Sequence, residues 1–396
     1  MKALQIDRKL ARFAAARIAG ALNPGGGAAY GPLELVDIDA PALPGPGWSI
    51  IKPRLAGICG SDLSTVDGTA SRYFEPLVSF PFVPGHEVVA DATTTDGASR
   101  RVVLEPVLGC VARAISPVCA SCARGDLGNC ERLAFGCVDA GLQTGFCCDT
   151  GGGWGTSMVA HESQLHDVPD DLSDEDAVLV EPAACAIHGA LRAEPEDGHT
   201  IALIGAGTLG LLTLAALHRY APEARIVVAA RYPEQVRLAK EFGATAVCTS
   251  DELPRVIRSL TGSMAYGNQL TGGCDTVVDC VGNDASIAQS LAIVRPRGRV
   301  VLVGMPGRVK LELTTLWHRE TQLVGAYAYG TETLPDGGRS RTFDLAFDLA
   351  RTAGLGRLLT QTYSLSDYRD AIEHAANAGR RGAVKIAFDL RGEKRR

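Results

Sequence analysis

Short apolar runs alternate with longer amphipathic segments between residues 183 and 329. Apolar runs bounded by glycine or charged residues predict buried strands, and apolar positions that recur every three or four residues predict helices. The predicted strands cover 201–204, 226–230, 275–279 and 299–304, and the predicted helices cover 209–220 and 234–242. Strands and helices in this alternation are typical of parallel βαβ units. We therefore expect a doubly wound α/β domain with a parallel sheet.

The flanking regions have a different pattern. Residues 1–182 are rich in Gly, Pro and short β-type runs, which predicts a β-rich domain with irregular loops. Beyond about residue 330 we expect a helix at 363–378 and a closing strand at 383–388. A chain of 396 residues is long enough for two domains. We expect one domain of residues 1–182 completed by 330–396, and a second of residues 183–329.

Composition excludes several classes of protein. Apolar residues make up 46% of the chain and charged residues 21%, which is typical of a soluble globular protein. The formal net charge is −6 and no basic run precedes the terminal Lys394–Arg396, so nucleic acid is not expected as a partner. No apolar stretch has the pattern of a membrane span or a secretory signal. We expect a cytoplasmic protein whose twelve cysteines are metal ligands or buried thiols rather than disulfides.

A glycine-rich hexapeptide follows the first strand of the α/β region and opens its first helix. It consists of Gly205, Ala206, Gly207, Thr208, Leu209 and Gly210. The first glycine permits a tight turn, the second lets a cofactor pyrophosphate approach the backbone, and the third allows close packing of helix on strand. N–H groups at the start of the helix can bind the phosphates. In this context the pattern predicts a dinucleotide site rather than a structural glycine turn.

The end of the second strand decides between NAD and NADP. An NAD site typically carries a carboxylate about twenty residues after the glycines, where it binds the ribose 2′-hydroxyl. Ala230 occupies this place and Arg231 follows it. The alanine removes repulsion against a 2′-phosphate and the arginine offers a charged partner, so NADP is favoured and NAD stays possible. The alternative is that Arg231 is only a solvated loop residue.

Three residues predict a catalytic zinc site. Cys59 lies in a Gly-Ile-Cys-Gly-Ser-Asp segment, His86 precedes Glu87, and Glu181 precedes a proline. One thiolate, one imidazole and one carboxylate leave the fourth tetrahedral position of Zn²⁺ open, and their charges offset the ion. Ser61 can pass a proton from a substrate hydroxyl, and Glu87 either orients the ligands or exchanges with water as a ligand. Taken singly, His86 could equally be a core histidine and Glu181 an acid at a helix start.

A cysteine cluster predicts a structural zinc site. Cys119, Cys122 and Cys130 follow one another at close spacing, and Cys110 lies a short way before them. Four thiolates around one tetrahedral ion make a closed site without an open position. The alternative is a set of four unrelated buried thiols.

These motifs together resemble the zinc-containing medium-chain dehydrogenase/reductase family, in particular its sorbitol and threonine dehydrogenase-like branches. The resemblance covers nearly the whole chain, including both cysteine motifs, the glycine hexapeptide and residues 382–385. It implies a GroES-like catalytic domain interrupted by a Rossmann domain, an active site in the cleft between them, and a homodimer or homotetramer. By the same resemblance Lys385 is expected to approach the cofactor phosphates. The residues expected to face the nicotinamide are Val281, Gly282, Val303 and Gly304.

The chain departs from the family pattern in three places. Ser116 stands where the cluster usually has its first cysteine, so either Cys110 takes that role or the zinc is held weakly. Ser64 stands where several members have a histidine that extends the proton relay, so proton release is expected through Ser61 and water. Residues 10–31 form an Ala- and Gly-rich insertion, expected to be exposed to solvent between early strands.

The sequence therefore predicts a zinc-dependent oxidoreductase. It would transfer a hydride between a nicotinamide cofactor and a small secondary alcohol or ketone, for example a polyol or another polar compound. One alternative is a zinc-free quinone or enoyl reductase of the same fold, and another is a non-catalytic NADP-binding redox sensor. Tyr73, Phe74 and Trp154 suit either a substrate-pocket wall or ordinary core packing.

Overall fold

The computed structural model describes residues 1–93 and 97–393, so the terminal Lys394–Arg396 lies outside the described residues. The chain forms two compact units. Unit 1 comprises Met1–Glu181 and Gly354–Arg396, and unit 2 comprises Pro182–Ala353. The first boundary lies next to the expected one at residue 182, whereas the second lies well beyond the expected residue 330.

The shifted second boundary has a structural cause. The segment after residue 330 forms the hairpin β16 (Thr331–Thr333) and β17 (Arg339–Arg341), followed by the helix α12 (Thr342–Ala353). α12 packs against α7 (Thr208–Tyr220) of unit 2. An ion pair joins the same two helices, because Arg219 lies 2.7 Å from the Asp348 carboxylate. The break in the βαβ pattern therefore marks an appendage of unit 2 and not the return of the chain to unit 1.

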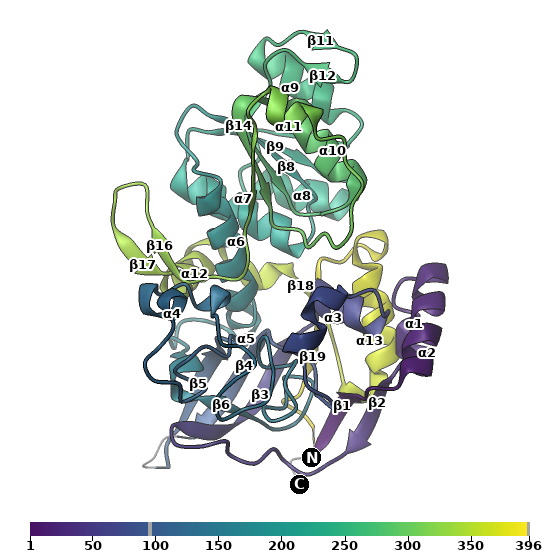
Figure 1. The fold of residues 1–396 in the computed structure, drawn as a ribbon, viewed down its shortest axis with the longest axis vertical. Helices are drawn as coiled ribbons and strands as arrows, with labels where there is room; N and C mark the ends of the chain where they lie inside the picture. The colour runs from purple at the N-terminus through teal and green to yellow at the C-terminus, as the bar shows by residue number, and fades with distance from the viewer. Residues whose placement is uncertain (94–96, 394–396) are drawn as a thin grey trace. The chain divides into compact units, whose positions relative to one another are not determined.

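Unit 1 is built around a seven-stranded sheet. The order is β18-β19-β3-β4-β5-β7, and β6 also pairs with β3. The strands are β3 (Trp48–Gly57), β4 (Val88–Thr93), β5 (Ser99–Leu104), β6 (Met158–His161), β7 (Leu165–Asp167), β18 (Leu359–Tyr363) and β19 (Lys385–Asp389). β19 runs antiparallel to β3, with Ala387 opposite Gly57. The end of the chain thus supplies two strands to the sheet of the N-terminal region (Figure 1).

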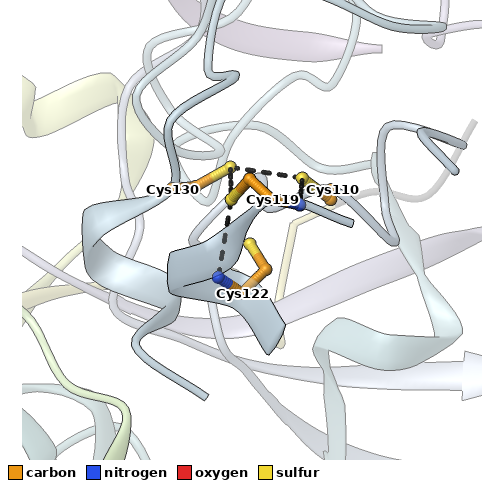
Figure 2. A group of neighbouring side chains, drawn as sticks. All are labelled: Cys110, Cys119, Cys122 and Cys130. Carbon is orange, nitrogen blue, oxygen red and sulfur yellow. Dashed lines mark hydrogen bonds between the residues drawn. The ribbon is translucent and has the colours of Figure 1, made fainter. Parts of the chain in front are cut away.

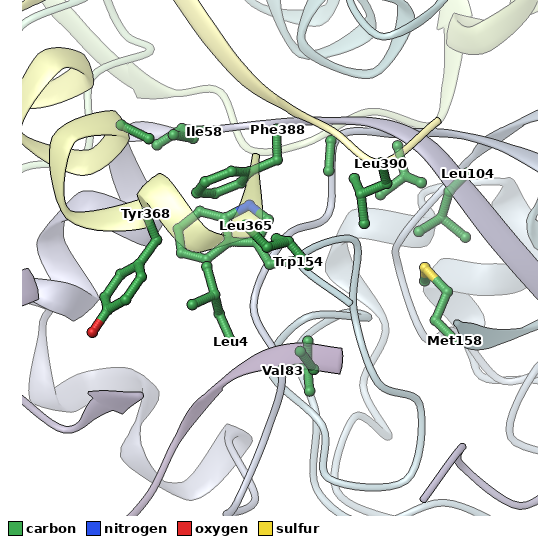
Figure 3. Packing of buried hydrophobic residues seen from close by; sticks show 14 of the residues in the cluster. Leu4, Ile58, Val83, Leu104, Trp154, Met158, Leu365, Tyr368, Phe388 and Leu390 are labelled. Carbon is green, nitrogen blue, oxygen red and sulfur yellow. The ribbon is translucent and has the colours of Figure 1, made fainter. Parts of the chain in front are cut away.

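Trp154 is the largest fully buried side chain in the protein. Its ring packs edge-on against Phe388, with the ring centroids 5.2 Å apart. Its Nε1 donates a hydrogen bond to the carbonyl oxygen of Gly57 at 3.3 Å, and Leu4 and Leu365 belong to the same buried cluster (Figure 3). An indole buried in this way contributes to the core of unit 1, so Trp154 is a packing residue and not a pocket wall.

The insertion at residues 10–31 is helical. α1 (Leu10–Leu22) and α2 (Gly27–Tyr30) lie in sequence between the paired strands β1 (Lys2–Ile6) and β2 (Leu33–Asp37). The insertion lies between early strands as expected, and its alanine-rich sequence favours helix. The insertion is also only partly exposed. The Asp67 carboxylate accepts hydrogen bonds from the N–H groups of Gly25 and Gly27, both at 2.9 Å, and α2 packs against α13 (Tyr368–Ala376).

The predicted helix at 363–378 is wrong in its first part. Tyr363 is the last residue of β18, and Leu365–Asp367 form a short 3₁₀ turn before α13 begins. Tyr363 at the end of β18 and Tyr368 at the start of α13 both pack toward the core. Their spacing therefore resembles the period of a single helix, although the chain changes from strand to helix between them. Among the described residues, no helix combines the length and the apolar character that crossing a bilayer requires.

Unit 2 contains a six-stranded sheet in the order β10-β9-β8-β13-β14-β15, with every neighbouring pair parallel. The strands are β8 (Thr200–Ile204), β9 (Arg225–Ala229), β10 (Ala246–Cys248), β13 (Cys274–Asp279), β14 (Val294–Leu302) and β15 (Gln322–Gly325). In chain order this is 3-2-1-4-5-6, the arrangement of a dinucleotide-binding doubly wound fold. The predicted strands and helices of this region are confirmed to within a few residues at their ends.

Both faces of the unit 2 sheet are covered. Ala202 and Ile204 of β8 belong to an apolar cluster with residues of α9 (Leu253–Thr261) and α10 (Asp284–Ile293). Ile201 and Leu203, which point to the opposite face, are fully buried as well. Parallel strands with helices on both faces read as continuous apolar runs, which is the pattern of this region.

The turn between β8 and α7 depends on Gly210. A Cβ atom at this position would lie 1.8 Å from the carbonyl oxygen of Gly205, so the helix could not start so close to the strand. A Cβ atom on Gly207 would meet no atom within 4 Å. Gly210 is therefore required by the close approach of helix and strand, whereas the surroundings of Gly207 have room for a side chain.

We expect Gly210→Ala to lower the free energy of unfolding of unit 2 by about 1–3 kcal/mol, because the added methyl group forces strand and helix apart. Gly207→Ala is the matched control and should change it by less than about 0.5 kcal/mol, because the new methyl group enters open space. Urea unfolding followed by circular dichroism compares the two variants. Equal midpoints for both would contradict this account of the turn.

Candidate functional site

The segments predicted to bind the cofactor lie at one edge of the unit 2 sheet. In the strand register Ile204 lies opposite both Ala229 and Asp279, and Asp279 lies opposite Leu302. These four residues end their strands at the same level. The chain continues from them into Gly205, Ala230, Cys280 and Val303, respectively. Doubly wound sheets bind ligands at this carboxyl edge, at the point where the strand order reverses, which here lies between β8 and β13.

The glycine hexapeptide has the geometry of a phosphate-binding turn. Gly205 has a φ of +96°, a left-handed conformation that favours glycine. Ala206 is buried, and Thr208 and Leu209 begin α7. The first N–H groups of a helix have no carbonyl partner within the helix, so they can donate to phosphate oxygens. The open space beside Gly207 leaves room for a pyrophosphate to come close to the backbone.

Asp279 organises the neighbouring loop and was not predicted. Its side chain is fully buried at the end of β13. One carboxylate oxygen accepts hydrogen bonds from the N–H groups of Val281 at 2.8 Å and Gly282 at 3.0 Å. The other accepts a hydrogen bond from the Ser286 hydroxyl at 2.7 Å. An aspartate that ends a strand and is followed by Cys-Val-Gly could have been recognised as a loop-fixing residue.

The loops after β13 and β14 are packed against each other through glycine. A Cβ atom on Gly304 would lie 2.6 Å from the backbone nitrogen of Gly282. Val281 is 45% exposed at this edge, whereas Val303 is buried against Gly189. The four residues expected at the nicotinamide therefore form one compact platform with an exposed apolar side chain.

Ala230 and Arg231 lie as the sequence argument requires. Ala230 is buried at the end of β9, and Arg231 is exposed beside it. The Arg231 guanidinium lies over the ring of Tyr232, 5.7 Å from its centroid. A carboxylate that would repel a 2′-phosphate is absent from the residues that directly follow β9. Whether Arg231 binds a phosphate stays a prediction.

Cys59 and His86 lie close together in unit 1, beside Asp62. Cys59 directly precedes α3 (Gly60–Val66), and its N–H donates a hydrogen bond to the Asp62 carboxylate at 2.9 Å. The other oxygen of Asp62 lies 3.5 Å from His86 Nδ1. One buried carboxylate thus lies beside both predicted ligands, since it accepts a hydrogen bond from the Cys59 backbone and lies close to the His86 ring. The sequence motif alone assigns no role to Asp62.

The charge state of His86 reflects these neighbours. Burial lowers its pKa, but the Asp62 carboxylate and the Cys59 thiol outweigh burial and raise the pKa well above the usual value. A metal ligand must be the neutral imidazole, so metal binding would displace a proton from this ring. The ring of Phe146 packs beside it, with centroids 5.9 Å apart, and limits its rotation.

Several buried polar atoms around Cys59 have no hydrogen-bond partner among the described residues. They are Ser61 Oγ, Asp62 Oδ1, His86 Nδ1 and Glu87 Oε2, although Asp62 Oδ1 lies 3.5 Å from His86 Nδ1 and Glu87 Oε2 is ion-paired with Lys385. Leaving such a group unsatisfied costs about 1–3 kcal/mol each, and a concentration of them in one place points to a ligand or an ordered water. A zinc ion with a bound water or alcohol fits this chemistry, because the ion draws the neighbouring groups into one polar network.

Glu181 is buried in the first turn of α6 (Val180–Arg192), as expected of an acid at a helix start. Among the described residues, the groups of three or more potential metal ligands with all ligand atoms within 4.8 Å do not include Cys59, His86 and Glu181. Cys59 and His86 both lie beside Asp62, and the structure does not gather all three predicted ligands within 4.8 Å of one another. The three-ligand zinc site stays a prediction.

Glu87 forms a buried ion pair with Lys385. The Lys385 ammonium also donates a hydrogen bond to the carbonyl oxygen of Ile58 at 3.0 Å. Both side chains are almost completely buried, at 1% and 3% exposure. A Cβ atom on Gly57 would lie 2.0 Å from Glu87 Oε2 and 2.9 Å from Lys385 Cε, so glycine is needed to make room for the pair.

Lys385 does not reach the surface in this structure. Burial lowers its pKa, but the carboxylate of Glu87 and the thiol of Cys59 outweigh burial, so the pKa is raised and the ammonium stays charged. An ammonium that is buried and paired is not exposed to a cofactor phosphate. The expected contact between Lys385 and the phosphates stays a prediction, and the observed partner is Glu87.

Cys110, Cys119, Cys122 and Cys130 form one group whose sulfur atoms all lie within 4.8 Å of one another (Figure 2). α4 (Ala120–Arg124) begins between Cys119 and Cys122. Burial opposes the Cys119 thiolate, but N–H donors from Cys122 and Glu131 outweigh it and lower its pKa to about 6. Burial raises the pKa of Cys122 and Cys130, so the case for a metal rests on the convergence of four sulfur atoms, which suits a tetrahedral Zn²⁺. Cys110 lies in the group, in the place that Ser116 leaves unfilled.

Arg113 connects the loops around the cysteine group. It was not identified from the sequence as a functional residue. Its guanidinium is fully buried and donates hydrogen bonds to the carbonyl oxygens of Leu108 at 2.9 Å, Val138 at 2.9 Å and Gly141 at 2.8 Å. A buried arginine satisfied by carbonyl groups fixes the loops that it joins. The long loop after Cys130 is therefore tied to the loop that carries Cys110.

The remaining predicted residues lie at the surface or are already bonded. Tyr73 is 79% exposed and its ring packs edge-on against Phe74. The Ser64 hydroxyl donates a hydrogen bond to the carbonyl oxygen of Gly60 at 2.9 Å, so it does not extend a relay from Ser61.

A further group, Asp139, Cys148 and Asp149, has its potential ligand atoms within 4.8 Å of one another, and its side chains are hydrogen-bonded within the group.

Comparison with known proteins identifies both units. Residues 45–170 match the family described as the alcohol dehydrogenase GroES-like domain, and residues 208–340 match the zinc-binding dehydrogenase family. Unit 1 is therefore GroES-like and unit 2 is the nucleotide-binding domain of the medium-chain fold.

Individual relatives agree with this assignment. The chain is 28% identical to the sorbitol dehydrogenase of Bacillus subtilis (strain 168) over 336 residues, which cover 82% of this chain and 86% of the relative. It is 27% identical to the L-idonate 5-dehydrogenase of Vitis vinifera, covering 90% and 93% of the two chains. The fold is similar to that of an Escherichia coli CFT073 alcohol dehydrogenase solved with NADH, with a TM-score of 0.73, 20% identity, and coverage of 98% and 99%.

We expect Cys110→Ser to remove one equivalent of tightly held zinc per chain, because the fourth thiolate of the cysteine group is lost. Cys137→Ser is the matched control, because Cys137 is exposed in the same lobe and lies outside the group. Elemental analysis after dialysis against a mild chelator compares the two variants with the wild type. Retention of the full zinc content by Cys110→Ser would show that Cys110 is not a ligand.

Proposed function

Because the chain belongs to the zinc-type medium-chain alcohol dehydrogenase-like proteins and is an alcohol dehydrogenase enzyme, we propose that it oxidises a secondary alcohol to a ketone with zinc and NADP. The reaction is reversible, and the substrate class is a polyol or a similarly polar alcohol. The convergence of Cys59 and His86 on one carboxylate, Asp62, carries the proposal. The polyol dehydrogenases among the relatives support the substrate class.

Cys59, His86 and Glu181 would hold the catalytic zinc in unit 1. When bound, the ion supplies Lewis acidity to the hydroxyl oxygen of the alcohol, and the nicotinamide accepts the hydride. Two negative ligands and one neutral imidazole balance the charge of Zn²⁺, so a developing alkoxide meets no excess negative charge. The Asp62 carboxylate, 3.5 Å from His86 Nδ1, would favour a proton on Nδ1 and so leave the Nε2 lone pair available to the ion.

Ser61 is the proton acceptor nearest to the proposed zinc ligands in sequence. Its hydroxyl oxygen is buried and has no hydrogen-bond partner among the residues that the structure describes, so it can accept the proton of a bound alcohol. The Ser64 hydroxyl is already donated to Gly60, so we propose that the proton leaves from Ser61 through water. Hydroxyl relays of this kind need donor and acceptor within about 3 Å once substrate is bound.

The cofactor lies along the carboxyl edge of the unit 2 sheet in this proposal. Its pyrophosphate is bound by the start of α7, and the nicotinamide lies against Val281 and Val303. NADP is preferred because Arg231 can pair with a 2′-phosphate and Ala230 does not repel it. The same edge could accept NAD, which carries a ribose 2′-hydroxyl in place of the 2′-phosphate. All twelve cysteines are free thiols, in keeping with a proposed cytoplasmic location.

The four-cysteine group has a structural part in the proposal. Cys110, Cys119, Cys122 and Cys130 would close a tetrahedral zinc site with no open position. A closed site cannot bind substrate, so its ion would hold the lobe and take no part in hydride transfer.

We expect Cys59→Ala to abolish alcohol oxidation while leaving NADP affinity nearly unchanged, because the residue belongs to unit 1 and the cofactor edge to unit 2. Steady-state rates over a panel of secondary alcohols and a fluorescence titration with NADPH measure the two quantities. Cys137→Ser controls for the loss of a thiol. Undiminished turnover in Cys59→Ala, or an active wild type that contains no zinc, would defeat the zinc mechanism and favour a zinc-free reductase.

We expect Ala230→Asp to raise the KM for NADP by roughly 10-fold or more and to improve the use of NAD, because a carboxylate repels the 2′-phosphate and accepts the ribose hydroxyl. Ala230→Asn adds similar bulk without charge and is the matched control. The ratio of kcat/KM for NADP and NAD is measured for each. A wild-type enzyme that prefers NAD would refute the assignment of Arg231.

A further inference from the structure

We propose that the exposed face of α1 is a homodimerisation surface, on which α1 of a second copy of this chain packs in antiparallel orientation. α1 belongs to the insertion at residues 10–31, to which the family resemblance gives no role. It contains none of the predicted zinc ligands or cofactor-binding residues, so the surface is independent of the proposed function.

One face of α1 is already used inside unit 1. Ala16 is fully buried, and the Phe13 ring packs edge-on against Phe80 with the ring centroids 6.3 Å apart. A Cβ atom on Gly20 would lie 2.7 Å from Asp67 Cγ, so this face lies directly on the rest of the chain. Residues three and four apart share one helix face, which leaves the opposite face uncovered. In Figure 1 α1 lies at the margin of unit 1, with no other element drawn beyond it.

The opposite face of α1, here the α1 surface, is apolar and exposed. It consists of Leu10, Ala11, Ala14, Ile18, Ala21 and Leu22. Its three large side chains are 76%, 66% and 84% exposed, in chain order. At 3.6 residues per turn the six positions span about 120° of the helix circumference. A helix that is apolar on two opposite faces is typical of a buried helix, so the α1 surface calls for a packing partner.

The order of residues on the α1 surface favours a second copy as that partner, because the six positions are symmetric about residue 16. Two antiparallel copies would pair Leu10 with the partner's Leu22, Ala11 with the partner's Ala21, and Ala14 with the partner's Ile18. Every position then meets another position of the same surface, as a two-fold interface requires. A different protein as partner would impose no such symmetry on the sequence.

The charges next to the α1 surface argue against an anionic membrane as the partner. Lys9 Nζ lies 3.0 Å from Asp7 Oδ2 and 3.3 Å from Glu34 Oε2, and Arg12 Nη2 lies 3.2 Å from Glu34 Oε1. These cations are therefore compensated within the chain. Arg17, exposed at one rim of the surface, stands apart from these ion pairs. Antiparallel packing brings the partner's Arg17 to the same rim, where salt screens the repulsion between the two.

The size of the α1 surface fits a weak dimer. At roughly 100 Å² for each large side chain and about half of that for each alanine, one copy offers about 450 Å². Two copies together would bury about 900 Å², close to the ~1,000 Å² of the smallest specific interfaces. We therefore expect a dissociation constant in the micromolar range or above.

Sedimentation velocity of the full-length protein, over concentrations that bracket this range, measures the association. The wild type should associate as its concentration rises, and more strongly at high salt. Ile18→Glu should weaken the association about 10-fold or more, because the dimer would bury an unpaired charge. Leu43→Glu is the matched control, because Leu43 is a 53% exposed leucine of unit 1 outside α1. Circular dichroism checks that both variants fold.

A pair of charged variants tests the register. Ala14→Glu and Ile18→Lys should each associate poorly alone, whereas a mixture of the two should associate again, because the introduced charges are opposite and lie at the same level. A mixture of Ile18→Lys with Ala21→Glu is the control. Position 21 shares its level with the partner's Ala11, so its charge would not meet the introduced lysine.

Three outcomes would overturn the proposal. The first is a wild type that stays monomeric, or associates no more strongly than Ile18→Glu. The second is equal recovery in both mixtures, which would refute the antiparallel register. The third is binding of the wild type, and not of Ile18→Glu, to vesicles of phosphatidylcholine and phosphatidylglycerol without self-association, which would assign the α1 surface to a membrane instead.

Discussion

The ion pair between Glu87 and Lys385 is the constraint on which the arrangement of unit 1 depends. Two opposite charges are almost completely buried, and each is the other's principal compensation. Such a pair adds little stability compared with apolar packing, but breaking it is costly, about 3–5 kcal/mol. The pair joins the last strand of the chain to the segment that carries His86.

In unit 2 the predicted cofactor edge is positioned by the register of parallel strands and by close contacts at glycines. Its cofactor edge needs no buried charge pair across distant segments, because parallel strands in register bring their carboxyl ends to one level. Glycines then set how closely the loops approach. Gly210 lets α7 start against β8, and Gly304 lets the loop after β14 touch the loop after β13. Asp279 fixes the second of these loops by accepting backbone N–H groups.

The sequence predicted most of unit 2 because its signals are local. A strand, a glycine turn and a helix occupy adjacent residues, so the apolar period and the glycine spacing carry the whole argument. It predicted less of unit 1. The partners of Glu87 and Cys59 are Lys385 and Asp62, and the first of these lies far along the chain, where no spacing rule applies. The family resemblance predicted the cofactor phosphates as the partner of Lys385, whereas in the structure its partner is the Glu87 carboxylate. Arg113 could not be predicted at all, because a buried arginine bonded to carbonyl groups leaves no charge pattern in the sequence.

The two groups of predicted zinc ligands differ in how far the protein assembles them, and this difference follows from their chemistry. The four cysteines come from a single stretch of chain, and local turns and the support of Arg113 bring all four sulfur atoms within 4.8 Å. A closed site can be completed by the protein alone. The proposed catalytic site would draw its ligands from three separated segments, and among the described residues no group of ligand atoms within 4.8 Å combines Cys59, His86 and Glu181. A zinc ion that binds substrate needs a fourth position left open by the protein, so its site cannot be closed by side chains as the cysteine group can.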